Sequence, residues 1–289
     1  MHITLIVPTN GRPSLVSRLL AHLERQTLHP DHVIVSATTP NDIEVRPDIS
    51  FKVSYVFGDP GLCAQRNRAM ALCDGTTDII SFFDDDFVPC DSYLETLSRV
   101  FREHPVYAVV TGDLLADGAQ GPGLGFDEAV AMLDAYRPSS LPAHVRDHPG
   151  AYGCNMSIRA QVIGDLRFDE RLPLYGWQED IDFTSQLRAH GRIVNIGQLW
   201  GVHLGAKGGR VNGVRLGYSQ IVNPIYLIGK GTMQRWFGIR LICRNLVANT
   251  LKSLRPEPYI DRRGRLKGNM IGFAHVLTRR ADPEHILKL

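Results

Sequence analysis

The chain has 289 residues, of which 44% are hydrophobic and 21% are charged, and this composition excludes a disordered or fibrous protein. Its formal net charge of +2 is unevenly distributed. Residues 1–204 hold 16 basic and 26 acidic side chains, a net charge of −10, whereas residues 205–289 hold 16 basic and 4 acidic ones, a net charge of +12. Such a basic block usually contacts phosphates on a nucleotide, a lipid or a nucleic acid, although a merely solvated basic face explains it equally well.

Short apolar runs alternate with helical patterns along residues 1–111. Strands are expected at residues 3–7, 33–36, 52–57, 79–83 and 107–111. Helices are expected at residues 13–26 and 61–73, and a third from an N-cap at Asp91 to Glu103. This βαβ series predicts an α/β fold, in which ligands bind beyond the carboxyl ends of the strands.

The remainder of the chain changes character twice. Glycines and prolines over residues 112–152 predict long loops, and a second set of elements follows at 153–204 with a strand at 192–196. A helix is expected at about residues 234–254, with its apolar side chains on one side and its basic side chains on another. The apolar side holds Trp236, Ile239, Cys243, Leu246, Val247, Leu251 and Leu254, and the basic residues are Arg240, Arg244 and Lys252. This helix either contacts an anionic membrane or packs its apolar side on the preceding domain.

Targeting signals and cysteines bear on the location. There is no uncharged apolar stretch of about 18 residues, and the first residues predict a strand and not a signal peptide. Five scattered cysteines, an odd number without paired spacing, indicate reduced thiols. We therefore expect a cytoplasmic protein that is at most peripheral on the inner face of the membrane.

Three aspartates, Asp84, Asp85 and Asp86, follow directly after the apolar strand expected at residues 79–83. Alternation along an extended chain points Asp84 and Asp86 to the same side and Asp85 to the other. Mg²⁺ and Mn²⁺ prefer oxygen ligands, so we assign Asp86 to a metal ion and Asp84 to the metal or a nucleotide ribose. The alternative is an acidic loop with solvated charges or a helix cap.

A second constellation lies at the start of a helix that begins near Glu179. Free backbone N–H groups there would keep Asp180 ionised, and an ionised carboxylate can accept a proton from an attacking hydroxyl. Trp177 and Glu179 are assigned a supporting role. An ordinary acidic first turn is an equally good interpretation.

Further along, His203 would suit Mn²⁺ as a third ligand, although a lone histidine is more often structural. Lys207 and Arg210 stand in a short glycine-containing loop and would suit a diphosphate leaving group.

Together these residues resemble the large inverting glycosyltransferase family 2, whose fold is the Rossmann-like GT-A type. The resemblance covers about residues 1–210, and it implies a nucleotide-binding half at 1–111, an acceptor and catalytic half at 112–210, and a basic, largely helical segment at 211–289. It implies that the pair Glu179-Asp180 contains the catalytic base, and that Asp84-Asp85-Asp86 is the metal motif. His203 matches a metal-binding histidine of some members.

The resemblance also distributes the ligand contacts. Nucleotide contacts fall on the ends of the early strands and on the second helix, at Pro8, Thr9, Asn10, Arg12, Ser36, Arg66, Asp84 and Asp85. Donor-sugar and acceptor contacts fall on Asn67, Gly153 and Asn155. Many relatives end the second strand with Asp-Asp-Gly-Ser, whereas this chain has Ser36-Ala37-Thr38-Thr39. The resemblance favours a UDP-sugar as the donor, and because the first of those aspartates reads the base in the relatives, this departure leaves dTDP- and GDP-sugars open.

The resulting hypothesis is a metal-assisted single displacement with Mn²⁺ or Mg²⁺, onto a glycan, a glycolipid or a small-molecule glycoside in polysaccharide biosynthesis. A nucleotidyltransferase is the nearest alternative, but the first strand is followed by only one glycine near the turn. A non-catalytic nucleotide-sugar binder is the other. No nucleic-acid partner is expected, because the arginines are not interleaved with stacking aromatics.

Overall fold

The computed structural model describes residues 1–44, 48–136, 144–206 and 212–289. Its contacts divide the chain into two compact units. The sheet unit comprises Met1–Pro60, Ala64–Arg167 and Leu187–Gly209. The helical unit comprises Gly61–Cys63, Phe168–Gln186 and Arg210–Leu289. The sequence-based domain border after residue 210 stays a prediction, and the contacts group residues 168–186 with the C-terminal segment.

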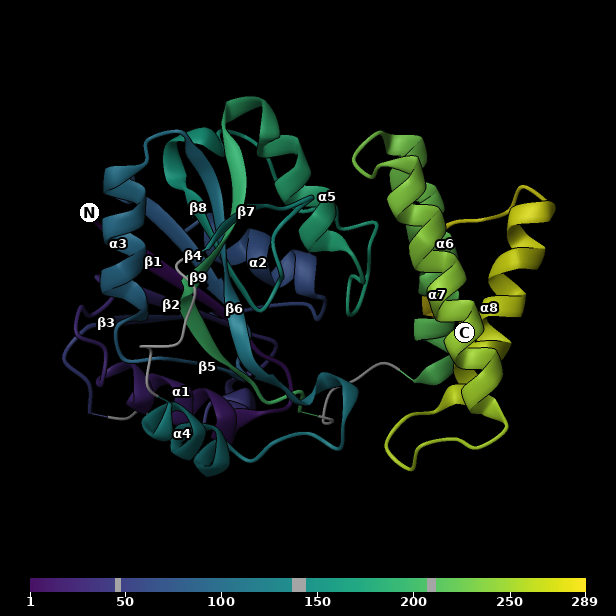
Figure 1. The fold of residues 1–289 in the computed structure, drawn as a ribbon, viewed down its shortest axis with the longest axis horizontal. Helices are drawn as coiled ribbons and strands as arrows, with labels where there is room; N and C mark the ends of the chain where they lie inside the picture. Colours follow the sequence, from purple (N-terminus) through teal and green to yellow (C-terminus); the bar gives the residue numbers. More distant parts are fainter. Residues whose placement is uncertain (45–47, 137–143, 207–211) are drawn as a thin grey trace. The chain divides into compact units, whose positions relative to one another are not determined.

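The described part of the sheet unit is built on one nine-stranded mixed sheet, seen in Figure 1. Its strands are β1 (Ile3–Pro8), β2 (His32–Ala37), β3 (Lys52–Phe57), β4 (Ile79–Phe83), β5 (Phe87–Pro89), β6 (Tyr107–Asp117), β7 (Val145–Asp147), β8 (Asn155–Arg159) and β9 (Arg192–His203). The order is β3-β2-β1-β4-β8-β6-β9-β5, with β7 also paired to β9. Strands β1 to β4 are parallel to one another, and β8 runs antiparallel to its neighbours β4 and β6. This mixed sheet with flanking helices confirms the expected α/β class.

Eight α-helices are described in the two units. They are α1 (Pro13–Leu23), α2 (Leu62–Met70), α3 (Tyr93–Glu103), α4 (Phe126–Ala135), α5 (Glu179–Gln186), α6 (Gly213–Lys230), α7 (Arg235–Ser253) and α8 (Arg262–Leu277). The expected N-cap of α3 was wrong: Ser92 takes that place, and the Asp91 carboxylate accepts a hydrogen bond from Arg25 Nη2 at 3.0 Å. The expected loop region at 112–152 also contains α4 and β7.

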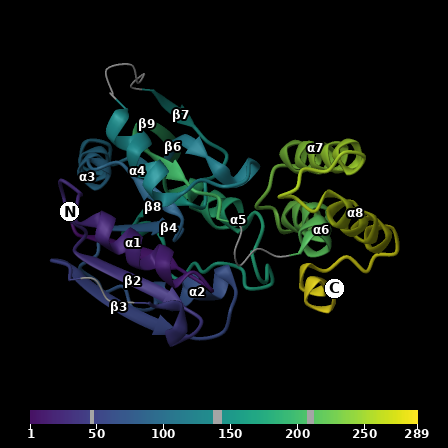
Figure 2. The ribbon, with the colours of Figure 1, turned by 90° about the horizontal axis from the view of Figure 1, so that it is seen from below.

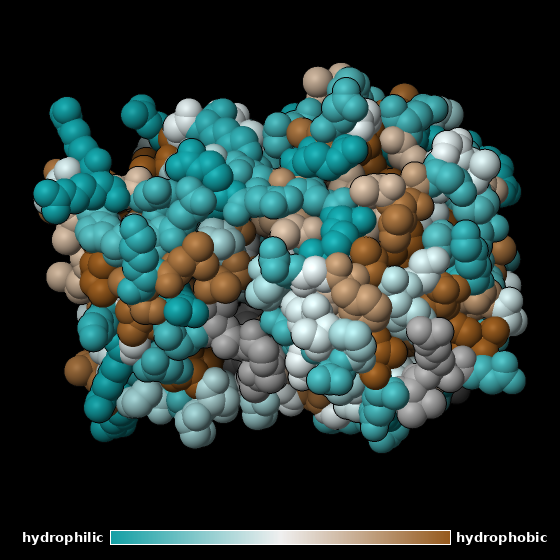
Figure 3. All heavy atoms as spheres, turned by 180° about the vertical axis from the view of Figure 1, so that it is seen from behind, coloured by the Kyte–Doolittle hydropathy of each residue, from teal (hydrophilic) through white to brown (hydrophobic). Residues whose placement is uncertain are grey.

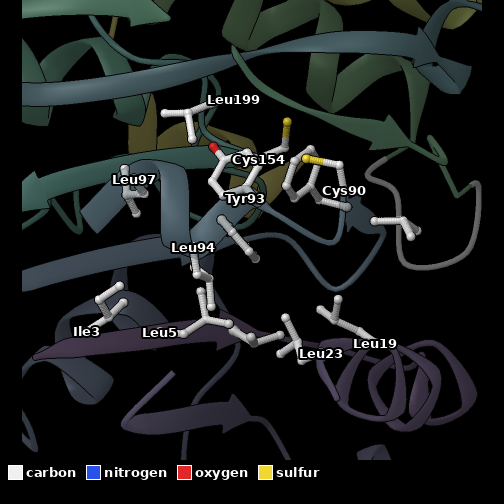
Figure 4. Close-up of a cluster of buried hydrophobic side chains, with 14 of the residues drawn as sticks. Ile3, Leu5, Leu19, Leu23, Cys90, Tyr93, Leu94, Leu97, Cys154 and Leu199 are labelled. Atoms are coloured by element: carbon white, nitrogen blue, oxygen red, sulfur yellow. The ribbon is translucent and has the colours of Figure 1, made fainter. Parts of the chain in front are cut away.

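The core of the sheet unit lies between the sheet and the helices α1 and α3 (Figure 4). Every residue of β1 and β2 is buried, as the continuous apolar runs of central parallel strands predict. Leu19 and Leu23 of α1 and Leu94 and Leu97 of α3 pack into the same cluster. Burying a leucine side chain stabilises a fold by about 1.5–3 kcal/mol, so this cluster fixes the sheet that carries the site.

Strand β9 extends well beyond the expected strand at 192–196, and its last residues complete one end of the sheet. The pairing of β5 with β9 brings Phe87 opposite His203. A side chain at Gly201 could not be accommodated, because its Cβ would lie 2.5 Å from the ring of Phe87. The pairing of β6 with β9 brings Asp117 opposite His203 as well. The long β9 therefore delivers His203 beside two acidic segments.

In the helical unit, α6, α7 and α8 pack side by side (Figure 2). Gly217 of α6 permits the close approach of α8, because a Cβ there would lie 2.0 Å from the carbonyl oxygen of Arg265. Buried amide groups bridge the helices, since Asn249 Nδ2 donates to Gln220 Oε1 and to Asn269 Oδ1. The expected helix at 234–254 is confirmed as α7. Among the described residues, no helix combines the length and hydrophobicity needed to cross a lipid bilayer.

Candidate functional site

The carboxyl end of β4 carries the three aspartates into a cluster with the end of β9. Each of Asp84, Asp86 and His203 offers one ligand atom, and these atoms all lie within 4.8 Å of one another. The donor set of two carboxylates and one imidazole fits Mn²⁺, and Mg²⁺ through its oxygens. A metal ion at these residues agrees with the chemistry of the groups that the fold brings together.

Asp86 and His203 are both buried and oriented by further hydrogen bonds. Asp86 Oδ2 accepts from the backbone N–H of Ala206 at 2.8 Å, and its Oδ1 lies 3.4 Å from His203 Nε2. Burial raises the pKa of Asp86, but His203 and Arg12 outweigh this effect and lower it to about 2. Asp86 is therefore an ionised carboxylate at neutral pH.

His203 is held on its other nitrogen by Asp117, the last residue of β6. The distance from His203 Nδ1 to Asp117 Oδ1 is 2.9 Å. Burial lowers the pKa of His203, but Asp117 and Asp86 raise it to about 10. A carboxylate on Nδ1 directs Nε2 toward a metal and fixes the ring orientation. The sequence analysis missed Asp117, because it ended that strand at Thr111.

Asp84 is the most exposed of the three aspartates, with its side chain 25% exposed. Its Oδ1 lies 3.2 Å from Nη2 of Arg66, a fully buried arginine of α2. Arg66 Nη2 also donates to the carbonyl oxygen of Gly153 at 2.9 Å. A buried guanidinium thus connects the acidic cluster to the loop before β8, where donor-sugar and acceptor contacts were expected.

Asp85 faces the turn after β1. Thr9 Oγ1 donates to Asp85 Oδ2 and Arg12 Nη1 donates to Asp85 Oδ1, both at 2.7 Å. Burial raises the pKa of Asp85 to about 7, against the opposing charge of Arg12. Arg12 Nη1 also lies 3.4 Å from Asp86 Oδ2. The turn after β1 is therefore fastened to the acidic cluster.

The other predicted nucleotide residues line the ends of β1 and β2. Pro8 is buried at the end of β1, and Asn10 is exposed beyond it. Ser36 is fully buried, and its Oγ has no hydrogen-bond partner among the described residues. Gln65 of α2, which the sequence analysis missed, donates to the carbonyl oxygens of Thr9 and Ser36 at 2.6 and 2.9 Å. One amide side chain thereby joins the two strand ends.

The residues expected near the donor sugar lie at different depths. Asn155 of β8 is fully buried, where its Oδ1 accepts from Thr111 Oγ1 at 2.7 Å. Its Nδ2 has no partner within the described part of the chain. Asn67 of α2 is partly buried. Lys207 and Arg210, the predicted diphosphate contacts, lie outside the described residues.

Asp180 lies in the first turn of α5, in the helical unit. Its Oδ1 accepts the backbone N–H of Ile181 at 2.7 Å, as expected for a carboxylate at a helix start. Glu179 is buried beside it. The preceding segment is conformationally unusual, since Gln178 has a φ of 77° without being a glycine. Asn223 Nδ2 holds this segment by donating to the Trp177 carbonyl oxygen at 2.9 Å.

A partly buried ion-pair cluster fastens α5 to the end of α6. Lys230 Nζ lies 2.7 Å from Asp182 Oδ2 and 2.7 Å from Asp169 Oδ2. Thr232 Oγ1 donates to Asp182 Oδ1 at 2.6 Å, and Tyr226 OH donates to Asp169 Oδ2 at 2.7 Å. We call these five residues the α5 clamp. The sequence analysis gave no signal for it, because its members are spread from Asp169 to Thr232 along the chain.

The comparisons with known proteins place this arrangement among solved folds. The sequence profile described as glycosyl transferase family 2 matches residues 4–119, which confirms the resemblance stated from the motifs. TarS residues 1–349 from S. aureus is similar in structure, with 14% identity and a TM-score of 0.55, covering 98% of this chain and 89% of that one. The same TarS segment in complex with UDP-GlcNAc gives 13% identity and a TM-score of 0.55, with the same coverage. No curated protein sequence matches the chain. The fold is of the GT-A type.

Proposed function

We propose that this chain, whose residues 4–119 match glycosyl transferase family 2, is an inverting glycosyltransferase that moves a sugar from a nucleotide diphosphate to an acceptor hydroxyl. The observation that carries the proposal is the convergence of Asp84, Asp86 and His203 at the strand ends of a GT-A fold. A cluster of this composition suits a substrate whose diphosphate needs a cation.

A divalent cation, Mn²⁺ or Mg²⁺, would be held by Asp84, Asp86 and His203. Bound there, it would offset the negative charge that develops on the diphosphate leaving group. Asp117 orients His203 through Nδ1, and the backbone N–H of Ala206 orients Asp86. Lys207 and Arg210 are proposed to bind the same diphosphate from the neighbouring loop.

The catalytic base in this proposal is Asp180. Its carboxylate accepts the proton of the acceptor hydroxyl, whose oxygen attacks the anomeric carbon opposite the leaving diphosphate, so that the configuration inverts. The hydrogen bond from Ile181 N–H supports an ionised Asp180. Glu179 and Trp177 support the base by shaping the first turn of α5.

A UDP-sugar is the favoured donor. The support is that one of the similar TarS structures contains UDP-GlcNAc and another contains UDP. Thr9 and Arg12 belong to the proposed nucleotide site together with Pro8, Asn10, Ser36, Arg66, Asp84 and Asp85. Asn67, Gly153 and Asn155 are proposed to contact the donor sugar and the acceptor. Ser36 replaces the aspartate of many relatives, so dTDP- and GDP-sugars belong in the same test.

The acceptor in this proposal is a glycan, a glycolipid or a small glycoside of polysaccharide biosynthesis. We place the enzyme in the cytoplasm, because its five cysteines are scattered and all are free. Its basic C-terminal segment would bring it to the inner face of the membrane.

A donor screen tests the function. The protein is incubated with Mn²⁺ or Mg²⁺ and with UDP-, dTDP- and GDP-sugars, and the released nucleoside diphosphate is measured with and without a chelator. Release from one donor that the chelator abolishes is the expected result. Donor binding without release across a panel of acceptors would favour a non-catalytic binder, and pyrophosphate formation from a nucleoside triphosphate would favour a nucleotidyltransferase.

A further inference from the structure

One side of α7, called its outward side here, exposes large apolar side chains. Trp236 is 82% exposed, Val247 55% and Leu251 64%. Leu254, which caps the helix, is 79% exposed. The residues of α7 that are buried are Gly238, Leu241 and Asn249, on the opposite side of the helix. Within the described residues of the helical unit, the apolar side of this helix is therefore exposed.

Positive charge accompanies this apolar side. The sequences of α7 and α8 contain eight lysines and arginines and no aspartate or glutamate. Arg240 and Arg244 are exposed, and within the described ranges no carboxylate forms an ion pair with either. Helical periodicity puts Arg240 between Val247 and Leu251 within the apolar stripe and Arg244 at its margin beside Leu251. Figure 3, which views the molecule from behind, shows hydrophobic atoms set among hydrophilic ones over the C-terminal helices.

The chemistry of this face selects one kind of partner. A second copy meeting it through the same helix would place arginines against arginines with no carboxylate between them, which is unfavourable. The exposed tryptophan and aliphatic side chains need an apolar partner, and the arginines need a negatively charged one. A surface with negative charges above an apolar layer offers both. The interface of an anionic bilayer is such a surface, and tryptophan prefers it.

We propose that the outward side of α7, formed by Trp236, Arg240, Arg244, Val247 and Leu251, is a docking surface for a bilayer that contains anionic lipid. We call it the α7 face. The helix lies parallel to the membrane plane, with its apolar side chains among the lipid headgroups and its arginines at the phosphates. This inference gives the membrane contact of the proposed function a defined surface, and the docking itself does not depend on sugar transfer.

The test is flotation of the full chain with vesicles. One set is phosphatidylcholine alone, and the other is an equal mixture of phosphatidylcholine and phosphatidylglycerol. We expect flotation with the anionic vesicles only, and weaker flotation as the salt concentration rises, because screening reduces the attraction. Insertion of Trp236 is followed by quenching of tryptophan emission with brominated lipid, which Trp236→Phe should reduce.

Paired variants separate the α7 face from general basicity. Arg240→Ala and Arg244→Ala should each weaken anionic vesicle binding about fivefold. Arg146→Ala is the matched control, because Arg146 is an exposed arginine of β7 in the sheet unit. Leu251→Ala should weaken binding about tenfold. Its control is Val106→Ala, since Val106 is 60% exposed and lies outside the helical unit.

Three results would overturn the proposal. The first is equal flotation with neutral and anionic vesicles, or none with either. The second is that the α7 variants bind as well as their controls. The third is a dimer in solution that Trp236→Phe or Leu251→Ala dissociates, which would assign the face to a second copy. Release of nucleoside diphosphate with a soluble acceptor is measured in parallel, so that failure of docking and failure of sugar transfer are told apart.

Discussion

Two buried aspartates, Asp86 in the sheet unit and Asp182 in the helical unit, have cationic neighbours but differ in how tightly these are bound. Asp182 receives Lys230 and Thr232 at 2.7 and 2.6 Å, which are hydrogen-bond distances for both of its oxygens. Asp86 has His203 and Arg12 at 3.4 Å, and its one short contact comes from a backbone N–H at 2.8 Å. Both oxygens of Asp182 therefore have a short side-chain contact, whereas Oδ1 of Asp86 has only the 3.4 Å contact among the described residues.

This difference separates a structural carboxylate from a ligand-binding one. Removing a partner from Asp182 leaves a buried charge uncompensated, which is destabilising. The looser partners of Asp86 can be exchanged for a metal ion with less loss. Burial and residue type are the same in both cases, so the spacing of the partners carries the distinction. Substitutions at Asp86 should therefore mainly change metal binding, whereas substitutions around Asp182 should mainly change the free energy of unfolding.

The largest expected effect is on Asp180. Asp180→Asn should lower the rate of sugar transfer by about 10²–10⁴-fold, because the amide cannot accept the proton of the acceptor hydroxyl. Donor binding, measured by calorimetry, should be retained. Near-normal turnover in this variant would show that another group acts as the base.

In the acidic cluster, Asp86→Asn should weaken Mn²⁺ binding by at least about 100-fold, more than the loss of an outer-shell partner usually costs. Titration calorimetry with Mn²⁺ measures it. Asp113→Asn is the matched control, since Asp113 lies in β6 of the same sheet but is not among the three clustered ligands. Equal affinities in the two variants would remove Asp86 from the metal site.

In the α5 clamp, Lys230→Met should lower the free energy of unfolding by about 1–3 kcal/mol, because Asp182 stays buried while the partly exposed lysine limits the loss. It should also lower kcat more than KM if the clamp positions α5 for catalysis. Lys252→Met is the control, since Lys252 pairs with Glu257 at the surface and should cost less than about 1 kcal/mol. Chemical denaturation compares them, and equal losses would mean that the clamp is an ordinary surface pair.

The smallest expected effect is the change in Mn²⁺ affinity with each unit of pH. His203 has a pKa raised to about 10 in the metal-free protein, above the ordinary value of 6.5, so a proton and a metal ion compete for it. Mn²⁺ affinity should rise about tenfold per pH unit from neutral pH toward 10. The metal-free protein should show the opposite sign: the stability from charged His203 is full below pH 6.5 and is lost as the pH rises through about 10. His203→Gln should flatten both profiles, and an unchanged slope would contradict the assignment.

Much of the fold could be predicted from periodicity. The bounds of β3 and β4 agree with the predicted ranges, because continuous or alternating apolar runs ended at polar residues there. The acidic end of β4 was predicted for the same reason. The lengths of β6 and β9 were not, since their later halves contain glycines and polar residues that pair through backbone hydrogen bonds and not through hydrophobic patterning.

The candidate site could be predicted only where chemistry was concentrated in sequence. Asp84 and Asp86 are adjacent to an apolar strand and were found, and His203 was proposed from its chemistry. Asp117 and Lys230 were missed, because each acts through a partner more than forty residues away. Such pairings depend on strand register and helix packing, which a local pattern does not contain.

The division of the chain has a consequence for how this protein can be rebuilt. The chain passes between its two units five times, at residues 60–61, 63–64, 167–168, 186–187 and 209–210. The α5 clamp joins two of the segments that make up the helical unit. The C-terminal helices therefore do not form a separate structural unit without residues 168–186. A chimera that exchanged residues 211–289 alone would separate Lys230 from Asp169 and Asp182, so recombination between relatives should move residues 168–186 and the C-terminal helices as one inherited block.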